Sequence, residues 1–344
     1  MKSSSFFCGR AVFAAALPLL AACNGSVHVE PADADAVADT LAADVAEDPD
    51  PCVVHSVFHD VRAYAPTGDG GEIVATGPAY GANGSAVVHK LDASCQPAWA
   101  FHAPPGDTLW ILRVASDAAG NVIIAGSHSA ASEPDPALRT GGALLLVMLD
   151  PGGHERWRVA SPLGGRLSRI VLAPAGDVVV SGRAHDLQRG QWFDLVARYD
   201  DAGQQRWQRR CGDERARVND LAVPDAGDVL LAGRFAEPFD FGGGLLTPAH
   251  AAGQMSTFDA FLVKLDAAGA HRWSARFGDE RSQSLDRVSV DASGEVTVRG
   301  RGNGTIDLGG GALSLGESGT FGAGFDAEGR WLWSALDGAA SSAP

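Results

Sequence analysis

Lysine is scarce in this chain of 344 residues, which contains only Lys2, Lys90 and Lys264. Glycine-rich loops that cradle phosphate groups end in Gly-Lys, and no such pair occurs. The sequence also lacks a Gly-x-Ser-x-Gly turn, and His154-Glu155 is not followed by the second histidine of a zinc-protease helix. These absences argue against a phosphate-binding loop, a lysine that forms a Schiff base, and hydrolases of these two kinds.

Positive charge is also scarce, because 27 Lys and Arg stand against 42 Asp and Glu, for a formal net charge of −15. Residues 24–51 carry eight carboxylates and no Lys or Arg. Such a segment has little to bury and repels itself, so residues 23–51 are predicted to form an extended acidic tether. Residues 52–344 retain a net charge of −9. Nucleic-acid-binding domains are usually basic, and nucleic acid is therefore not an expected partner.

The N-terminus has an apolar run that is too short to cross a membrane. The run, Ala11 to Ala22, has roughly twelve residues, whereas a spanning helix needs about 20. Residues 1–22 are therefore predicted to be a secretion signal. The run ends in Leu20-Ala21-Ala22-Cys23, which resembles the lipobox of bacterial lipoproteins. The resemblance implies acylation of Cys23 and anchoring in a membrane by lipid; ordinary signal cleavage, leaving Cys23 a plain thiol, is the alternative.

Asn24 follows the lipobox cysteine. In lipoproteins the signal for retention in the inner membrane favours Asp at this position. The resemblance therefore implies a lipid-anchored protein at the outer membrane or the cell surface.

A helical period is missing from the rest of the chain, whereas glycine is abundant, with 43 residues. One series of glycines ends short apolar runs, each preceded by a turn pair, which is typical of a hairpin that enters a buried strand. The five runs are Ile73 to Gly77, Val122 to Gly126, Val178 to Gly182, Val229 to Gly233 and Val296 to Gly300.

A second series repeats an Asp followed seven residues later by a Trp. The five pairs are Asp92 and Trp99, Asp150 and Trp157, Asp200 and Trp207, Asp266 and Trp273, and Asp326 and Trp333. From each of the first four tryptophans to the next strand-ending glycine the distance is 25 to 27 residues. Insertions therefore collect in the connection from that glycine to the following motif Asp. A fixed half and a variable half are typical of stacked repeats.

Within the fourth repeat the pattern predicts strands near 220–224, 229–233, 260–265 and 272–277. Four antiparallel strands joined by short hairpins make a propeller blade. The sequence therefore predicts an all-β fold, a β-propeller of five four-stranded blades, over residues 52–338, with a disordered tail at 339–344. Residues 53–58 are a possible extra strand beside a neighbouring blade.

The repeated residues have structural explanations. The Asp ends a strand and opens a turn, where its carboxylate accepts hydrogen bonds from backbone N–H groups about two residues on. The Trp begins the next strand, where its ring covers the gap between blades while its indole N–H finds a carbonyl. Triple glycines at 242–244 and 309–311 are predicted to be hairpin turns. No catalytic residue is assigned to either series.

Three cysteines remain after Cys23 in the exported domain. Cys95 takes the place of the turn glycine in the first repeat, and Cys52 lies just before that repeat. A Cys52–Cys95 disulfide is possible in an exported protein and would fasten the N-terminus. Cys211 corresponds to Phe277 and is expected to be buried.

The fourth repeat resembles the bacterial β-propeller repeat proteins of the SBBP type. The resemblance rests on Phe239 to Gly244, Asp259 to Asp266, Trp273, and Phe277-Gly278-Asp279. The fifth repeat keeps Ile306 to Gly311, and the first three lack that segment. The resemblance implies a propeller and an exported location, and it carries no common catalytic residues.

Quinoprotein-type propellers, including an outer-membrane lipoprotein that assists barrel assembly, are similar at the Asp-to-Trp motif. Here the turn is one residue shorter, the Thr of their motif is missing, and adjacent cysteines do not occur. Their fold also has eight blades rather than five. The resemblance leaves an outer-membrane assembly accessory as an alternative.

We expect a non-catalytic binding or scaffold module at the cell envelope, with no metal or cofactor. Its protein or glycan partner would contact the variable connections at 127–143, 183–194, 234–259 and 301–321. Histidines near these connections, at His128, His185 and His250, are interpreted as exposed loop polarity. The alternative is a glycan-active enzyme that uses paired carboxylates. Its acids would come from Asp186, Asp194, Glu237 and Asp240.

Overall fold

The computed structural model describes most of residues 61–337, all within one compact unit, Asp50–Pro344. The described ranges are 61–77, 85–103, 107–130, 143–173, 176–186, 190–212, 215–224, 227–249 and 257–337. They contain strands and turns, and no helix in them is long and apolar enough to cross a membrane. The predicted signal peptide, the acidic tether, residues 53–58 and the tail lie outside the described residues.

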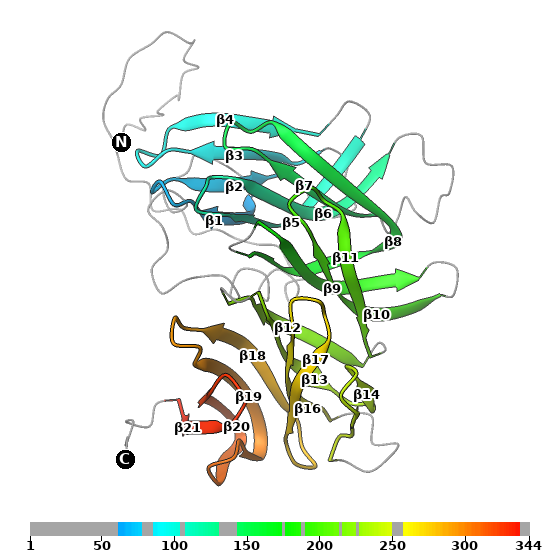
Figure 1. The fold of residues 1–344 in the computed structure, drawn as a ribbon, viewed down its shortest axis with the longest axis vertical. Coiled ribbons are helices and arrows are strands. Elements are labelled where there is room, and N and C mark those ends of the chain that lie inside the picture. The colour runs from blue at the N-terminus through cyan, green and yellow to red at the C-terminus, as the bar shows by residue number, and fades with distance from the viewer. Residues whose placement is uncertain are drawn as a thin grey trace, which may run out of the picture. The chain divides into compact units, whose positions relative to one another are not determined.

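The strands form antiparallel sheets in which successive strands of the chain are neighbours (Figure 1). Unit one contains β1 (Val61–Pro66), β2 (Glu72–Thr76), β3 (Val87–Leu91) and β4 (Pro97–His102). Unit two contains β5 (Asp107–Ser116), β6 (Val122–Ala130), β7 (Ala143–Leu149) and the first half of β8 (Glu155–Leu172). Unit three contains the second half of β8, β9 (Val178–Asp186), β10 (Gln191–Tyr199) and β11 (Gln205–Cys211).

Two further units follow the same order. Unit four contains β12 (Ala216–Ala222), β13 (Val229–Phe235), β16 (Asp259–Leu265) and β17 (His271–Phe277), with a small ribbon of β14 (Phe239–Asp240) and β15 (Leu245–Leu246). Unit five contains β18 (Gln283–Val290), β19 (Val296–Asp307), β20 (Ala312–Phe325) and β21 (Trp331–Leu336). The predicted all-β, propeller-type fold of four-stranded antiparallel units is confirmed.

Units two and three differ from the prediction of separate four-stranded sheets. The strand β8 is continuous and pairs with β7 through its first half and with β9 through its second half. The two units therefore form one seven-stranded sheet. Gly164 pairs with Ala143 of β7 and with His185 of β9, so the backbone stays extended where a loop was expected.

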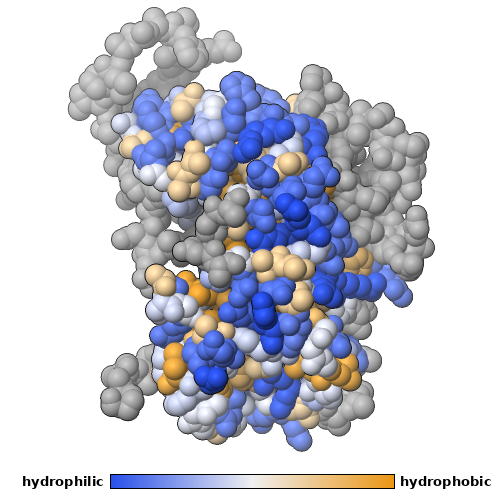
Figure 2. Space-filling view, in the orientation of Figure 1, coloured by the Kyte–Doolittle hydropathy of each residue, from blue (hydrophilic) through white to orange (hydrophobic). Residues whose placement is uncertain are grey.

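Apolar side chains fill the spaces between successive units. Leu230 and Leu262 of unit four are fully buried against Val298 and Phe321 of unit five. Similar clusters join units one and two, two and three, and three and four. A strand that is buried on both faces has a continuous apolar run, as in β13 from Val229 to Ala232. Figure 2 shows a face on which hydrophilic residues predominate and hydrophobic residues form small patches.

Antiparallel order divides every unit into two ends. The turns between its first and second strands and between its third and fourth strands lie at one end, which we call the turn end. The connections between the second and third strands and between successive units lie at the other end, the loop end. All four variable connections predicted from the sequence belong to the loop end.

Strands extend further into these connections than predicted. The strand β6 continues to Ala130 and β9 to Asp186, and β19 and β20 take up most of residues 301–321. The prediction of a long loop at 301–321 is therefore wrong. Cross-strand pairing continues from Val296 opposite Phe325 to Asp307 opposite Ala312, which satisfies the backbone without a loop.

Candidate functional site

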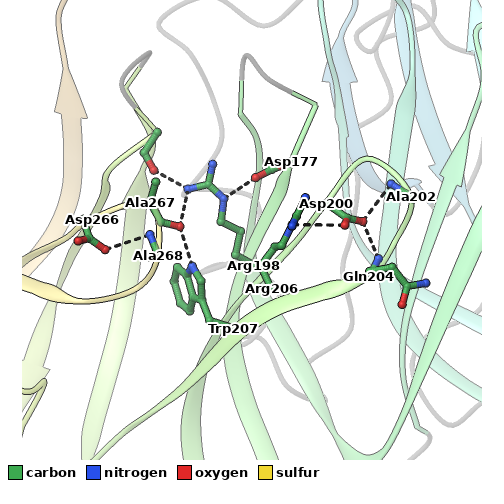
Figure 3. A network of polar contacts seen from close by, with 11 residues as sticks. Asp177, Arg198, Asp200, Ala202, Gln204, Arg206, Trp207, Asp266, Ala267 and Ala268 are labelled. Carbon is green, nitrogen blue, oxygen red and sulfur yellow. Dashed lines mark hydrogen bonds and ion pairs between the residues drawn. The ribbon is translucent and has the colours of Figure 1, made fainter.

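The repeated aspartates lie at the turn end, where each organises a hairpin. Asp266 Oδ1 accepts hydrogen bonds from the backbone N–H groups of Ala268 at 3.0 Å and Ala270 at 2.8 Å. Asp92, Asp150, Asp200 and Asp326 make the same pair of bonds two and four residues on. Figure 3 shows this arrangement at Asp200. In Asp150 the hydrogen bond from the His154 backbone is the main cause that lowers the pKa of the carboxyl group.

Four of the repeated tryptophans join their unit to the next one. The indole Nε1–H donates to the backbone oxygen of the residue that follows the next motif Asp, at 3.0 to 3.1 Å. The pairs are Trp99 with Pro151, Trp157 with Asp201, Trp207 with Ala267, and Trp273 with Ala327. The indole thus donates to a carbonyl of the next unit while its ring remains free to pack against that unit.

A turn glycine of the next unit lies beneath each of these four rings. A Cβ atom added to Gly153 would stand 2.6 Å from the ring of Trp99, and the distance is 2.8 Å from Gly329 to Trp273. These glycines also have φ values near +80°, where other residues are strained. The turn glycines are therefore required both by the backbone and by the neighbouring indole.

Trp333 departs from this pattern. Its Nε1–H donates to the carboxylate of Glu295, in its own unit, at 2.9 Å. Its ring lies over Gly324 of the adjacent strand, and 39% of the residue is exposed. In unit one the position of the turn glycine is occupied by Cys95, which has a φ of 59°.

A cation two residues before the motif Asp strengthens the contact between units. Arg198 is almost fully buried, and its Nε donates to Asp177 at 2.7 Å while a terminal nitrogen donates to the carbonyl oxygen of Gly227 (Figure 3). Lys264 holds the same position in unit four, where its Nζ contacts Asp228 at 3.2 Å and the Ala327 carbonyl oxygen at 3.0 Å. Lys264 therefore serves a structural contact.

Four of the glycines that end the apolar runs, Gly126, Gly182, Gly233 and Gly300, lie near the loop end, opposite a β-bulge, and in unit one Thr76 holds that position. In each unit the first strand has a register shift facing the end of the second strand, for example between Val218 and Asp220. The bulge brings a carbonyl oxygen against the second strand. A Cβ atom would stand 1.9 Å from the Arg217 oxygen at Gly233 and 2.4 Å from the Ser284 oxygen at Gly300. A side chain at Gly233 or Gly300 would therefore clash with the backbone.

Asp194 lies at the loop end, between units three and four. Its Oδ2 accepts a hydrogen bond from the backbone N–H of Val218 at 2.7 Å, next to the bulge of unit four. Burial raises the pKa of Asp194 to about 7, and the hydrogen bond and the positive charges of Arg217 and Arg183 oppose that rise. The residue is 3% exposed and is therefore not a loop acid.

Asp240, another acid of the alternative enzyme, is engaged in a turn of its own. Asp240 Oδ1 accepts hydrogen bonds from the backbone of Gly242 at 2.6 Å and Gly244 at 3.0 Å, which closes the ribbon of β14 and β15. The Gly242 hydrogen bond lowers the pKa of Asp240. Glu237 is half-buried, and the side chain of Asp186 lies outside the described residues. Asp194 and Asp240 therefore serve separate structural contacts rather than forming a carboxylate pair.

Arginines stacked on aromatic rings mark the loop end of units three and four. The guanidinium carbon of Arg183 lies 5.5 Å from the ring centre of Trp192, that of Arg210 lies 4.4 Å from Phe193, and that of Arg234 lies 4.8 Å from Phe258. Trp192 is 39% exposed. We call these six residues the Arg–aromatic surface. The sequence did not reveal this surface, because each arginine and its aromatic partner come from different segments of the chain that only the pairing of strands brings together.

Some of the cysteines and histidines singled out from the sequence lie within the described residues, and others lie outside them. Cys211 is a buried free thiol, whereas Cys95 is disulfide-bonded to a partner outside the described residues. Cys23 and Cys52 lie outside the described residues, as do His250 and the side chains of His128 and His185. The Cys52–Cys95 pairing stays a prediction.

No protein-family model and no curated protein matches this chain. Among solved structures, a protein of unknown function from Bacteroides caccae is similar at 12% identity and a TM-score of 0.39, covering 80% of this chain and 81% of its own. A protein from Lactobacillus plantarum is similar at 13% identity and a TM-score of 0.44, covering 80% and 70%. Hydrazine synthase from Kuenenia stuttgartiensis is similar at 11% identity and a TM-score of 0.48, covering 79% and 65%. These likenesses do not indicate an activity for this chain.

Proposed function

We propose that this protein is an exported, lipid-anchored binding module of the cell envelope whose partner contacts the loop end. The sequence supports export and anchoring through the lipobox-like segment that ends in Cys23 and through the acidic tether that follows it. The resemblance of the fourth and fifth repeats to SBBP-type proteins agrees with that location. The domain itself is a stack of rigid units that presents connections of free sequence.

The observation that carries this proposal is the different use of polar groups at the two ends. At the turn end the repeated Asp, Trp and basic side chains are engaged in hairpins and in contacts between units, as at Asp266, Trp207 and Arg198. At the loop end Trp192 leaves 39% of its surface exposed beside Arg183. Trp192 is thus an exposed aromatic group beside an arginine at the end where sequence varies between the units.

The Arg–aromatic surface suits an acidic polysaccharide. An exposed indole offers a flat apolar face to a sugar ring, and guanidinium groups bind carboxylates or phosphates in two-point contacts. Arg210 is exposed as well as stacked, so its donors remain open to a ligand. A polymer with repeated negative charges would contact Arg210 beside the exposed ring of Trp192, despite the net negative charge of the chain.

A binding experiment with a matched pair of tryptophan variants tests this function. Trp192→Ala is expected to weaken binding to immobilised acidic polysaccharides by roughly tenfold or more, as at interface tryptophans. Trp331→Ala is the control, because Trp331 is 40% exposed but lies at the turn end. Equal loss in both variants, or binding of neutral and acidic glycans alike, would contradict the proposal.

The same experiment separates binding from catalysis. Retained glycan with no new reducing ends or unsaturated products supports a binding module. Product formation that disappears in Asp186→Asn would establish the glycan-active enzyme instead. Capture of a protein that depends on Trp192, without any glycan binding, would replace the polysaccharide by a protein partner.

Lipid anchoring has its own test. Mass spectrometry of the N-terminal peptide from membranes should show an acylated Cys23, and Cys23→Ser should release the protein from the membrane fraction. An unmodified N-terminus produced by ordinary cleavage would remove the anchor from the proposal and leave the binding surface unaffected.

A further inference from the structure

Unit one has two buried faces, although only one of them packs against another unit. Ile73 and Val88 face unit two, within the cluster that both units share. On the opposite face Val74 is 0% exposed and Leu91 is 2% exposed, and they form a separate cluster with Val61 and Cys95. All described members of this second cluster belong to unit one. Because both residues are buried within this single chain, the cover for Val74 and Leu91 must come from elsewhere in the chain.

Unit five is poorly suited to provide that cover. In units two and four the face turned toward the next unit includes the apolar pairs Ile123 and Ala125, and Leu230 and Ala232. The corresponding residues of β19 are Thr297, which is half-buried, and Arg299, which is exposed. A polar outer face is typical of the terminal unit of a repeat array. Trp333 lies back over Gly324, as expected at a free face.

Cys95 also excludes the usual contact between units. Where a turn glycine faces a tryptophan, a Cβ atom would approach the ring to 2.6 to 2.8 Å. Cys95 has that Cβ atom and a bonded sulfur in addition. The tryptophan of unit five, or that of a second copy of the chain, therefore has no room to stack on unit one in the manner of the other four.

We propose that residues 51–60 of the same chain cover the outer face of unit one as an extended segment, joined to it by a Cys52–Cys95 disulfide. The segment would be attached to unit one at Cys95 and at Val61, which lie at opposite ends of the buried outer face. Cys95 lies at the turn end, and Val61, where β1 begins, lies at the loop end. Leu91 and Val74 belong to the same cluster as these two residues. The segment would thus run across these buried residues from Cys95 to Val61.

The length and pattern of the segment fit this path. Eight residues lie between Cys52 and Val61, and the nine residue steps of an extended chain span about 30 Å, more than the roughly 20 Å of a short strand. Side chains of an extended chain alternate, so Val54, Ser56 and Phe58 share the side of Cys52. Val54 and Phe58 on that side would face Val74 and Leu91.

Disulfide mapping and hydrogen exchange test the segment in the full-length protein. Peptide mapping without reductant should recover a peptide pair linked through Cys52 and Cys95, and two free thiols would overturn the proposal. Val54→Asp should speed amide exchange in β2 and β3 by roughly tenfold or more, because it opens the cover locally. Val57→Asp is the matched control, since it puts the same charge on the other side of the segment.

Two further outcomes would identify a different cover. Equal acceleration by Val54→Asp and Val57→Asp would contradict the proposed facing of the segment. If Trp333→Ala accelerates exchange in β2 and β3, unit five covers unit one and the proposal fails. Protection of these strands that rises with protein concentration would instead indicate a second copy. None of these measurements depends on the lipid or on a glycan.

Discussion

The indole Nε1–H of Trp273 donates to the carbonyl oxygen of Ala327 at 3.1 Å, while the same ring covers Gly329. One side chain thus connects units four and five through a hydrogen bond and an aromatic contact. Trp99, Trp157 and Trp207 repeat both contacts at the earlier junctions. These junctions give several direct tests of what holds the units together.

Trp273→Ala is expected to lower the free energy of unfolding by about 3 kcal/mol, the lower part of the range for large core side chains, because Trp273 is half-buried. Chemical denaturation measures the loss. Trp333→Ala is the matched control and should lose less, since its indole bonds within its own unit. Equal losses would show that the contact between units contributes little.

Gly329→Ala is expected to destabilise the protein by more than the strain of a positive φ alone. At Gly329 the new methyl group would meet the ring of Trp273, whereas at Gly311 nothing lies within 4 Å. Both glycines have positive φ values, 79° and 107°. Gly311→Ala therefore measures the backbone strain, of order 1 to 3 kcal/mol, and the excess in Gly329→Ala measures the clash. Thermal unfolding that shifts equally in both would contradict this account.

Arg198→Met is expected to destabilise the junction of units three and four by about 3 kcal/mol, because Asp177 and the Gly227 carbonyl oxygen lose a buried partner. Arg198→Lys should recover much of this loss, since units one and four have lysine at the same position. Urea denaturation of the two variants measures the difference. A lysine variant as unstable as the methionine variant would show that the guanidinium geometry is essential.

The stability of the fold should depend on the protonation of Asp194. Burial raises its folded pKa to about 7, above the value near 3.8 expected in an unfolded chain. The folded state therefore binds this proton more tightly, so the contribution is fully present below about pH 4 and is lost as the pH rises through 7. The linked loss of unfolding free energy is up to about 4 kcal/mol.

Asp194→Asn should remove this pH dependence, because the amide oxygen still accepts the hydrogen bond from Val218 and has no charge to bury. Denaturation midpoints between pH 4 and 8 make the comparison. Asp240→Asn is the control, since Asp240 is exposed and has a lowered pKa. Should the wild-type and Asp194→Asn curves keep the same slope, another group controls the transition.

Several features followed from the sequence because they involve few neighbouring residues. Asp266 forms its turn with backbone groups two and four residues away, so the motif itself predicts the hairpin. The alternation of short apolar runs and turns likewise predicted four antiparallel strands in unit four. The burial of Cys211 followed from its correspondence with Phe277.

Other features required the tertiary structure because they join residues far apart in the chain. The reason for glycine at Gly233 is the carbonyl oxygen of Arg217, which a bulge in the preceding strand brings against it. The Arg–aromatic surface likewise depends on strand pairing, which places Arg183 beside Trp192. The hydrogen bonds of Asp194 and Asp240 to the backbones of Val218 and Gly242 likewise could not be read from the sequence of the connections.

By itself, then, the sequence determined the repeat, its hairpins and its strands, since turn chemistry and apolar periodicity are local. Only the tertiary structure decided which units contact one another and what each repeated side chain binds. Trp273 and Trp333 occupy the same place in the motif, yet the indole of Trp273 donates to the next unit and that of Trp333 to Glu295 of its own unit. The difference arises from the residues that face each tryptophan in space, and the motif does not specify those residues.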